Sequence, residues 1–263
     1  MAIHKDKLKT QFALLLLVGI VLIDVVSLSK RFLNKDNFQE DPAENYFRAT
    51  GADEYIMSNA APGERVLNLI NPWNEARTSY YHESIGGYHG AKMRRYQDLV
   101  DNYLGSEANQ AITKLQNGRR DFSDLKILNM LNAKYLVAGN QKEAVITNPS
   151  AFGNTWVASD VVKAQNPSDV MNQLGSIDPR KTAVVDLNEA DPKFGGQGTI
   201  ALTERTPNKL VYTANISNGT ALGIFSEVYY PKSWVATRYL AFSIFRIFKS
   251  EKSLLPFCSF VIA

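Results

Sequence analysis

The feature that most constrains this chain is an apolar run near its N-terminus. Residues 12–28 read FALLLLVGIVLIDVVSL, seventeen residues in which Asp24 is the single charge. A helix that spans the hydrocarbon core of a bilayer needs about 17–25 such residues. Lys30 and Arg31 follow the run, where their long side chains reach the lipid headgroups. The run therefore predicts a transmembrane helix, within an anchor over residues 1–33, and the lipid bilayer as a partner.

Two other interpretations of this run compete with the membrane helix. A cleaved signal peptide needs small residues at a cleavage site, and the following VVSLSKRF offers no convincing pair. A helix buried in a soluble core carries a polar stripe, which residues 12–23 lack. Asp24 either reaches the membrane interface or packs against other membrane helices that are missing from this chain. Lysines flank the run on both sides, so positive charge alone does not decide its orientation.

The remainder has the composition of a folded protein. Of the 263 residues, 45% are hydrophobic and 21% are charged, which allows a sizeable core. The net charge of +3 comes from dispersed basic residues, so we expect no nucleic-acid partner. The single cysteine, Cys258, excludes an intramolecular disulfide and a cysteine-rich zinc site. Glycine-rich phosphate loops and the GxSxG motif are missing, so we expect no cofactor and assign no catalytic residue.

The first half of the soluble part reads as mostly helical. Residues 34–64 form a polar linker with a short helix around Gly51 to Ser58. A strand follows at residues 65–70, and residues 73–90 have no clear period and read as a loop. Helices are expected at 91–104, which ends at Gly105 as a C-cap, at 106–117, which Ser106 caps, and from Ser123 or Asp124 to Leu131, before a strand at 133–138.

The second half reads as mainly β. We expect strands at 156–163 and 183–187, a short helix at 167–174, and three further strands from residue 198 onward. Asn218-Gly219 predicts a hairpin between the last two of these, and Thr206-Pro207-Asn208 the turn before them. The predicted fold class is α+β: one N-terminal transmembrane helix, then a mixed α/β domain over 65–237 that ends in an antiparallel β-rich region. Residues 238–263 form an atypical apolar tail.

One segment has the composition of a binding site. Residues 74–95 read NEARTSYYHESIGGYHGAKMRR and contain two of the three histidines, several tyrosines and four basic residues. Basic side chains bind phosphate, and tyrosine rings stack on sugar faces. This composition predicts an anion or sugar site with the substrate-binding residues Arg77, Tyr80, His82, Tyr88, His89, Lys92 and Arg95. The alternative is a long ordered loop whose aromatic residues pack on the following helix.

A metal site is not predicted for this segment. His82-Glu83 and His89 do not have the HExxH spacing, and no third ligand is specified. Lys92, Arg94 and Arg95 fall in the expected first turn of a helix, where cations are electrostatically disfavoured. Either an anionic ligand or a structural carboxylate would compensate them.

Seven strings along the chain, in one order, resemble a known family. They are LIDVVSLSKRFLNKDNF (22–38), RVLNL (65–69), NEARTSYYHESIGGYHGAKMRRYQDLVD (74–101), LKILNMLNAKYLV (125–137), AFGNTWVA (151–158), TPNKLVY (206–212) and FSEVYYPKSW (225–234). Together they resemble the YfhO-type family of bacterial multi-pass membrane proteins, especially its Bacteroidetes branch.

The resemblance implies a glycosyltransferase-like protein of the cytoplasmic (inner) membrane that uses a polyprenyl-phosphate-linked sugar. It implies a cytoplasmic N-terminus and an extracytoplasmic soluble domain. The catalytic acid of such proteins is expected in an early loop outside this chain, so the chain resembles a C-terminal fragment whose partners are a glycan or lipid-linked sugar and the missing membrane helices.

The sequence departs from the family pattern after Trp234, and we hypothesise a reading-frame change near codon 235. Three functions are compatible with these features of the sequence. The first is an accessory domain that binds glycan or polyprenyl-phosphate-linked sugar and is not catalytic by itself. The second is a structural or interaction module of an envelope complex. The third is a metal-dependent hydrolase that uses His82, Glu83 and His89.

Overall fold

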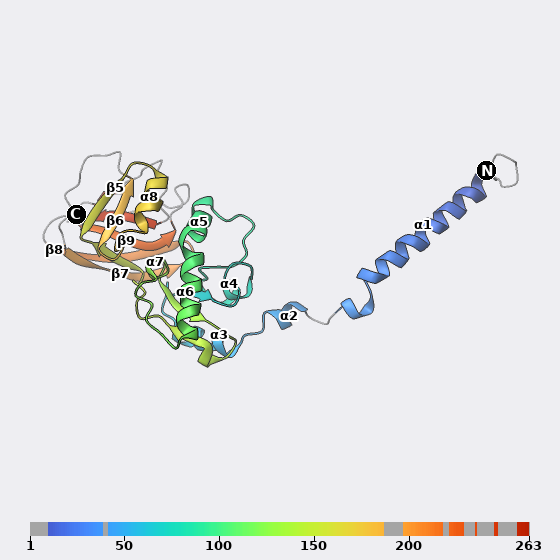
Figure 1. Cartoon of the computed structure of the whole chain (residues 1–263), viewed down its shortest axis with the longest axis horizontal. Coiled ribbons are helices and arrows are strands. Elements are labelled where there is room, and N and C mark those ends of the chain that lie inside the picture. Colours follow the sequence, from blue (N-terminus) through green and yellow to red (C-terminus); the bar gives the residue numbers. More distant parts are fainter. Residues whose placement is uncertain are drawn as a thin grey trace. The chain divides into compact units, whose positions relative to one another are not determined.

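The structure of the chain is a computed structural model that describes residues 10–38, 42–186, 197–217, 221–228, 235, 245–246 and 257–262. The chain divides into two compact units, residues 1–48 and residues 49–263 (Figure 1).

The first unit is dominated by one long apolar helix. Helix α1 covers Thr10–Phe32, and none of its described residues is buried within the molecule. It is long and apolar enough to cross a membrane, a test that a signal sequence near the N-terminus also passes. A short 3-10 turn, η2 (Lys35–Asn37), and a five-residue helix, α2 (Pro42–Tyr46), follow. The predicted apolar helix is confirmed, and it continues through the basic residues that flank the run.

The second unit begins with a small sheet that is buried on both faces. Its strands are β1 (Arg65–Asn68), β2 (Ala133–Val137) and β3 (Val145–Thr147), with β2 in the middle. Strand β1 runs parallel to β2, and Leu67 lies opposite Leu136. These two leucines belong to the main core, whereas Val66 and Tyr135 contact Ile56 on the other side. Because side chains alternate along a strand, the sheet separates two apolar clusters.

Helices supply most of the main core. Helix α3 (Gly51–Asn59) carries Ile56, while α4 (Arg77–Tyr81) lies in the segment that the sequence presents as a loop. A long helical stretch then consists of α5 (Arg94–Leu99), the π-helical turn η3 (Val100–Leu104) and α6 (Gly105–Gln116). Helix α7 (Lys126–Met130) precedes β2, and the 3-10 turn η4 (Lys142–Ala144) precedes β3.

The expected helix break at Gly105 is wrong. Gly105 has φ −61° and ψ −44°, which are ordinary helical values, and its N–H donates to the carbonyl of Val100 five residues earlier. The stretch from α5 to α6 is therefore continuous (Figure 1, green). A C-capping glycine adopts positive φ, and the residue that does so here is Gly118, at φ +69°. The predicted end of the second helix is thus confirmed.

The expected start of the third helix is also wrong, because its capping group comes from elsewhere in the fold. The carboxylate of Glu107 accepts the backbone N–H groups of Ile127 (3.0 Å) and Leu128 (2.8 Å). Helix α7 therefore begins at Lys126 rather than at Ser123 or Asp124.

Within its described residues, the β-rich part contains three further sheets. One has the order β10-β11-β9-β4 and is antiparallel, one pairs β5 with β6 in parallel, and one pairs β7 with β8 in a hairpin. The strands are β4 (Thr155–Ala158), β5 (Asp160–Ala164), β6 (Thr182–Asp186), β7 (Gln197–Thr206), β8 (Lys209–Ser217), β9 (Ala221–Val228), β10 (Phe245–Arg246) and β11 (Phe257–Ile262). Helix α8 (Pro167–Leu174) connects β5 to β6 and packs on them. The predicted α+β class, with antiparallel strands toward the C-terminus, is confirmed.

Two expectations for these strands are wrong. The run 156–163 is two strands in different sheets, because the N–H groups of Ser159 and Asp160 both donate to the carbonyl of Lys181 and turn the chain. The hairpin expected at Asn218-Gly219 does not form, since β8 pairs with β7 and β9 pairs with β4 and β11. Residues 221–226 of β9 are all buried, whereas β8 alternates between exposed and half-buried positions. A fully buried strand takes a central position in a sheet. The turn residues themselves lie outside the described part of the chain.

Candidate functional site

The segment predicted as the site is an ordered loop built around two glycines. The N–H of Gly87 donates to the carbonyl of Pro72 (2.7 Å), and the N–H of Tyr88 donates to the carbonyl of Glu75 (3.0 Å). A Cβ on Gly86 would lie 1.7 Å from the Pro72 carbonyl oxygen, and Gly87 has φ +100°. The two glycines therefore permit a close return of the chain that no other residue allows.

Two of the predicted residues, Arg77 and His82, bind a carboxylate that the sequence did not single out. Asp53 of α3 lies 3.1 Å from the Nε2 atom of His82 and accepts a hydrogen bond from the Arg77 guanidinium. Thr50 also donates to Asp53, through its N–H (2.8 Å) and its hydroxyl (2.6 Å). Burial alone would raise the pKa of Asp53, but the hydrogen bonds from Thr50, Arg77 and His82 outweigh it and lower that pKa.

This cluster fastens α4 to α3. The His82 side chain is only 5% exposed, and Asp53 binds both His82 and Arg77. The one sequence signal for Asp53 is its place three residues after Thr50, which forms a capping box at the start of α3. Arg77 and His82 therefore hold the loop in place through their contacts with Asp53.

The predicted tyrosines lie on the outside of the same segment. Tyr80 is 63% exposed and Tyr88 is 72% exposed. Tyr80 packs edge-to-face on Tyr81, with their ring centroids 4.9 Å apart. His89 is exposed, and its Nδ1 atom accepts the N–H of Ala91 (3.1 Å). Lys92 and Arg95 are half-buried at the start of the long helical stretch.

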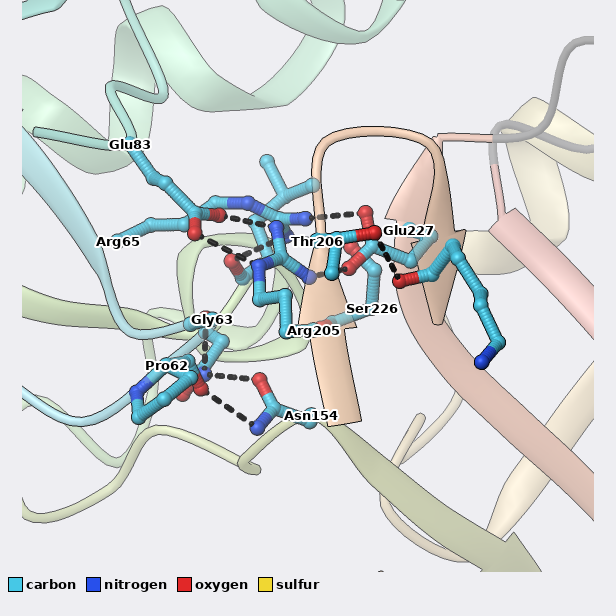
Figure 2. A network of polar contacts seen from close by, with 12 residues as sticks. Pro62, Gly63, Arg65, Glu83, Asn154, Arg205, Thr206, Ser226 and Glu227 are labelled. Carbon is cyan, nitrogen blue, oxygen red and sulfur yellow. Dashed lines mark hydrogen bonds and ion pairs between the residues drawn. The ribbon is translucent and has the colours of Figure 1, made fainter. Parts of the chain in front are cut away.

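Glu83 belongs to a network of four charges that connects distant strands. Arg205 of β7 lies between two carboxylates, binding Glu83 through Nε (2.8 Å) and Nη2, and Glu227 of β9 through Nη1 (2.8 Å). Arg65 of β1 binds the other oxygen of Glu227 at 2.9 Å. Figure 2 shows the arginines and glutamates alternating, so each charge has an opposite neighbour. The network holds the helical half of the unit against the β-rich half.

Backbone groups and amide side chains complete this network. Arg65 also donates to the carbonyls of Leu131 (2.9 Å) and Ser226. Nearby, the amide of Asn154 donates to the Pro62 carbonyl (2.9 Å), as Figure 2 also shows. Buried charges persist only when they are paired and hydrogen-bonded, and this set satisfies that condition.

The three side chains proposed for a metal-dependent hydrolase thus bind three different partners. His82 binds Asp53, Glu83 binds Arg205, and His89 accepts a backbone N–H in its own loop. The contacts of these three side chains give them different structural partners.

A hollow of about 900 Å³ lies beside the predicted segment. One wall comes from the loop and contains Trp73, Asn74 and Lys92. The other wall is the long helical stretch, along which Gln97, Asp101, Gly105, Asn109 and Thr113 follow one another at intervals of four residues and line the hollow. Side chains four residues apart share one face of a helix, so the continuity of α5 to α6 creates this wall.

The π-helical turn lies within that wall. Val100 and Asp101, its first two residues, line the hollow together with Gly105, the residue that follows it. Single π-helical turns inside α-helices occur frequently at functional sites, where the extra residue redirects side chains. Asp101 accepts a hydrogen bond from Gln97 (2.7 Å), which orients both groups.

Of the predicted residues, only Lys92 lines this hollow. The sequence did not indicate Asp101 and Asn109 because the expected break at Gly105 placed the two helical halves apart. Trp73 was missed because it immediately precedes the segment 74–95 that was chosen by composition. A search for polar residues at intervals of four across residues 97–113 would have found the stripe.

Comparisons of the chain with models of known families, with curated proteins and with solved structures find no significant match.

Proposed function

We propose that this chain is a membrane-anchored, extracytoplasmic glycan-binding domain that accompanies a glycosyltransferase-like membrane protein. In this proposal α1 is retained as the anchor, and the hollow binds a saccharide, free or linked to polyprenyl phosphate. The chain itself performs no transfer, because the catalytic acid expected from the family resemblance lies outside it.

The observation that carries the proposal is the chemistry of the hollow. Trp73 offers an aromatic surface, and an indole is both apolar enough to stack on a sugar ring and polar enough to stand at a wet surface. Around it are amide and hydroxyl groups, each of which donates and accepts hydrogen bonds; they belong to Asn74, Gln97, Ser106, Asn109, Gln110 and Thr113. An apolar surface beside convergent polar groups is the usual composition of a site for a small polar ligand.

A binding measurement on the full chain in lipid nanodiscs tests this proposal. A glycan array identifies the ligands, and calorimetry measures their dissociation constants. We expect Asn109→Ala to weaken binding about fivefold to tenfold, the loss of one or two hydrogen bonds.

The matched control is Gln116→Ala, an exposed position of the same helix that does not line the hollow. Equal affinities for the two variants, or no binding to any saccharide, would contradict the proposal.

The exposed aromatic residues favour one alternative, a structural or interaction module. Tyr80 and Tyr88 are both more than 60% exposed on an ordered loop, and the aliphatic side chain of Ile70 is also more than 60% exposed. Rigid exposed aromatic side chains are common at protein interfaces. A stable protein partner that is lost in a Tyr80→Ala, Tyr88→Ala double variant, together with no glycan binding, would support this alternative.

A further inference from the structure

The charges in the hollow narrow the class of saccharide that fits it, an inference that rests on the function proposed above. Two ammonium groups and one carboxylate line the hollow, from Lys92, Lys114 and Asp101. Their contacts with the rest of the described chain differ, and that difference decides what a ligand must supply.

Lys114 is already neutralised by the protein. Its Nζ atom lies 2.8 Å from the carboxylate of Asp124 and donates to the carbonyl of Asp121 (3.0 Å). Lys92, by contrast, has no ion-pair partner among the residues that the structure describes, although its side chain is half-buried. A half-buried cation is stabilised by an anion that reaches it. The hollow therefore offers one positive charge, on Lys92, that lacks an ion-pair partner among the described residues, together with one carboxylate, on Asp101.

Asp101 sets a second requirement. Its carboxylate accepts only the amide of Gln97 within the described chain, so it retains free acceptor positions. A ligand must bring hydrogen-bond donors to Asp101 and an anionic group to Lys92. Vicinal hydroxyls are such donors, and two of them satisfy one carboxylate.

We infer that the hollow binds an acidic sugar, in which a carboxylate or phosphate on the hexose pairs with Lys92 while ring hydroxyls donate to Asp101. The ring itself stacks on Trp73. The preference for an anion then comes from one side chain, and the affinity for the sugar comes from the remainder of the wall.

Paired probes test this inference on the full chain in nanodiscs. The probes are glucuronate and galacturonate, the neutral sugars glucose and galactose, and the corresponding hexose 6-phosphates. We expect the better acidic probe to bind about tenfold more tightly than its neutral counterpart, and this ratio to fall toward one in Lys92→Gln. Raising the salt concentration from 50 to 500 mM is expected to reduce the same ratio. The uronates and the phosphates distinguish a carboxylate from a phosphate as the natural group.

Lys181→Gln is the matched control, since it removes one exposed positive charge outside the hollow. It is expected to keep the wild-type ratio. Neutral sugars that bind as tightly as acidic ones would overturn this inference and leave the proposed function standing. If no saccharide binds, both the inference and the proposed function are overturned. A ratio that survives in Lys92→Gln would also overturn the inference.

Discussion

At the scale of single residues, Glu107 carries the most unusual environment. Its carboxyl group is buried against the N-terminus of α7, where it accepts two backbone N–H groups. Burial raises the pKa of Glu107 from its usual 4.5 to about 7, although the hydrogen bonds from Ile127 and Leu128 partly oppose this effect.

This shift predicts how stability changes with pH. Between about pH 4.5 and 7 the folded chain holds a proton on Glu107 that the unfolded chain has lost, so the free energy of unfolding falls as the pH rises through this window. The expected fall is on the order of 3 kcal/mol. Urea denaturation of the detergent-solubilised chain, followed by tryptophan fluorescence, measures it. Glu107→Gln should remove most of this pH dependence, and a wild-type curve that rises over the same window would contradict the assignment.

The two arginines of the four-charge network should differ in their importance. The Arg65 and Glu227 side chains are 11% and 13% exposed, whereas Glu83, which Arg205 binds, is 39% exposed. Because solvent weakens exposed ion pairs, we expect Arg65→Ala to lower the free energy of unfolding by about 3 kcal/mol and Arg205→Ala by about 1 kcal/mol.

The same urea denaturation experiment measures both changes. Arg94→Ala serves as the control, because Arg94 pairs with Asp98 while it is 88% exposed. Its effect should stay within about 0.5 kcal/mol. A larger effect for Arg205→Ala than for Arg65→Ala would contradict the ranking.

At the scale of elements, the continuity of the helical stretch from α5 to α6 is the structural fact with the most consequences. Alanine substitutions at two glycines test this continuity. Gly105 has helical dihedral angles, so alanine fits its backbone, and the gain in helix propensity is offset by a Cβ 3.3 Å from the Val100 carbonyl oxygen. Gly118 has φ +69° and open space around it, so alanine there costs backbone strain alone.

We therefore expect Gly105→Ala to leave the free energy of unfolding within about 0.5 kcal/mol of the wild type, and Gly118→Ala to lower it by about 1 kcal/mol. Thermal unfolding followed by circular dichroism compares the two variants. If Gly105→Ala were the more harmful of the two, the helix would break at Gly105 after all.

At the scale of the whole molecule, the division into two units places the long apolar helix and the main apolar core in different units. Helix α1 belongs to the unit 1–48, and the apolar core lies in the unit 49–263. We expect the full chain to remain in the membrane fraction after carbonate extraction, and a variant without residues 1–48 to be soluble and to keep the near-ultraviolet circular dichroism of its tryptophans.

The protein recovered from the membrane and soluble fractions also distinguishes an anchor from a signal sequence. N-terminal sequencing of the membrane-bound protein should find the residues of α1 still attached. A mature protein that starts after residue 32 and is recovered in the soluble fraction would identify α1 as a cleaved signal sequence.

Much of the fold was predictable where a local pattern carries the information. The apolar run 12–28 predicts α1 because a helix of this length and composition can span a bilayer, although Asp24 lies within it. Helix α8 was predicted over its observed range, and the structure shows that Asn166 caps it and Pro167 begins it. The strands β1 and β2 were predicted because their apolar residues and the turns that flank them are neighbours in the chain.

Residues 74–95 were predicted as one binding segment, but the sequence did not indicate how the side chains within it are arranged. The composition of residues 74–95 does not show that Arg77 and His82 face inward to a carboxylate, while Tyr80 and Tyr88 face outward. The partner, Asp53, lies 24 residues before Arg77 and 29 residues before His82. No local period connects positions so far apart.

The sequence by itself determined the apolar helix, the approximate bounds of α3 and α8, and the end of α6 before Gly118. Each of these depends on residues within one or two turns of one another. Only the tertiary structure decided that β9 pairs with β4 and β11 rather than with β8, and that Glu107 caps α7. It also decided that one unbroken helix and a glycine-closed loop form the walls of the hollow. These outcomes depend on which groups satisfy buried strands, buried charges and free N–H groups, and those groups come from distant parts of the chain.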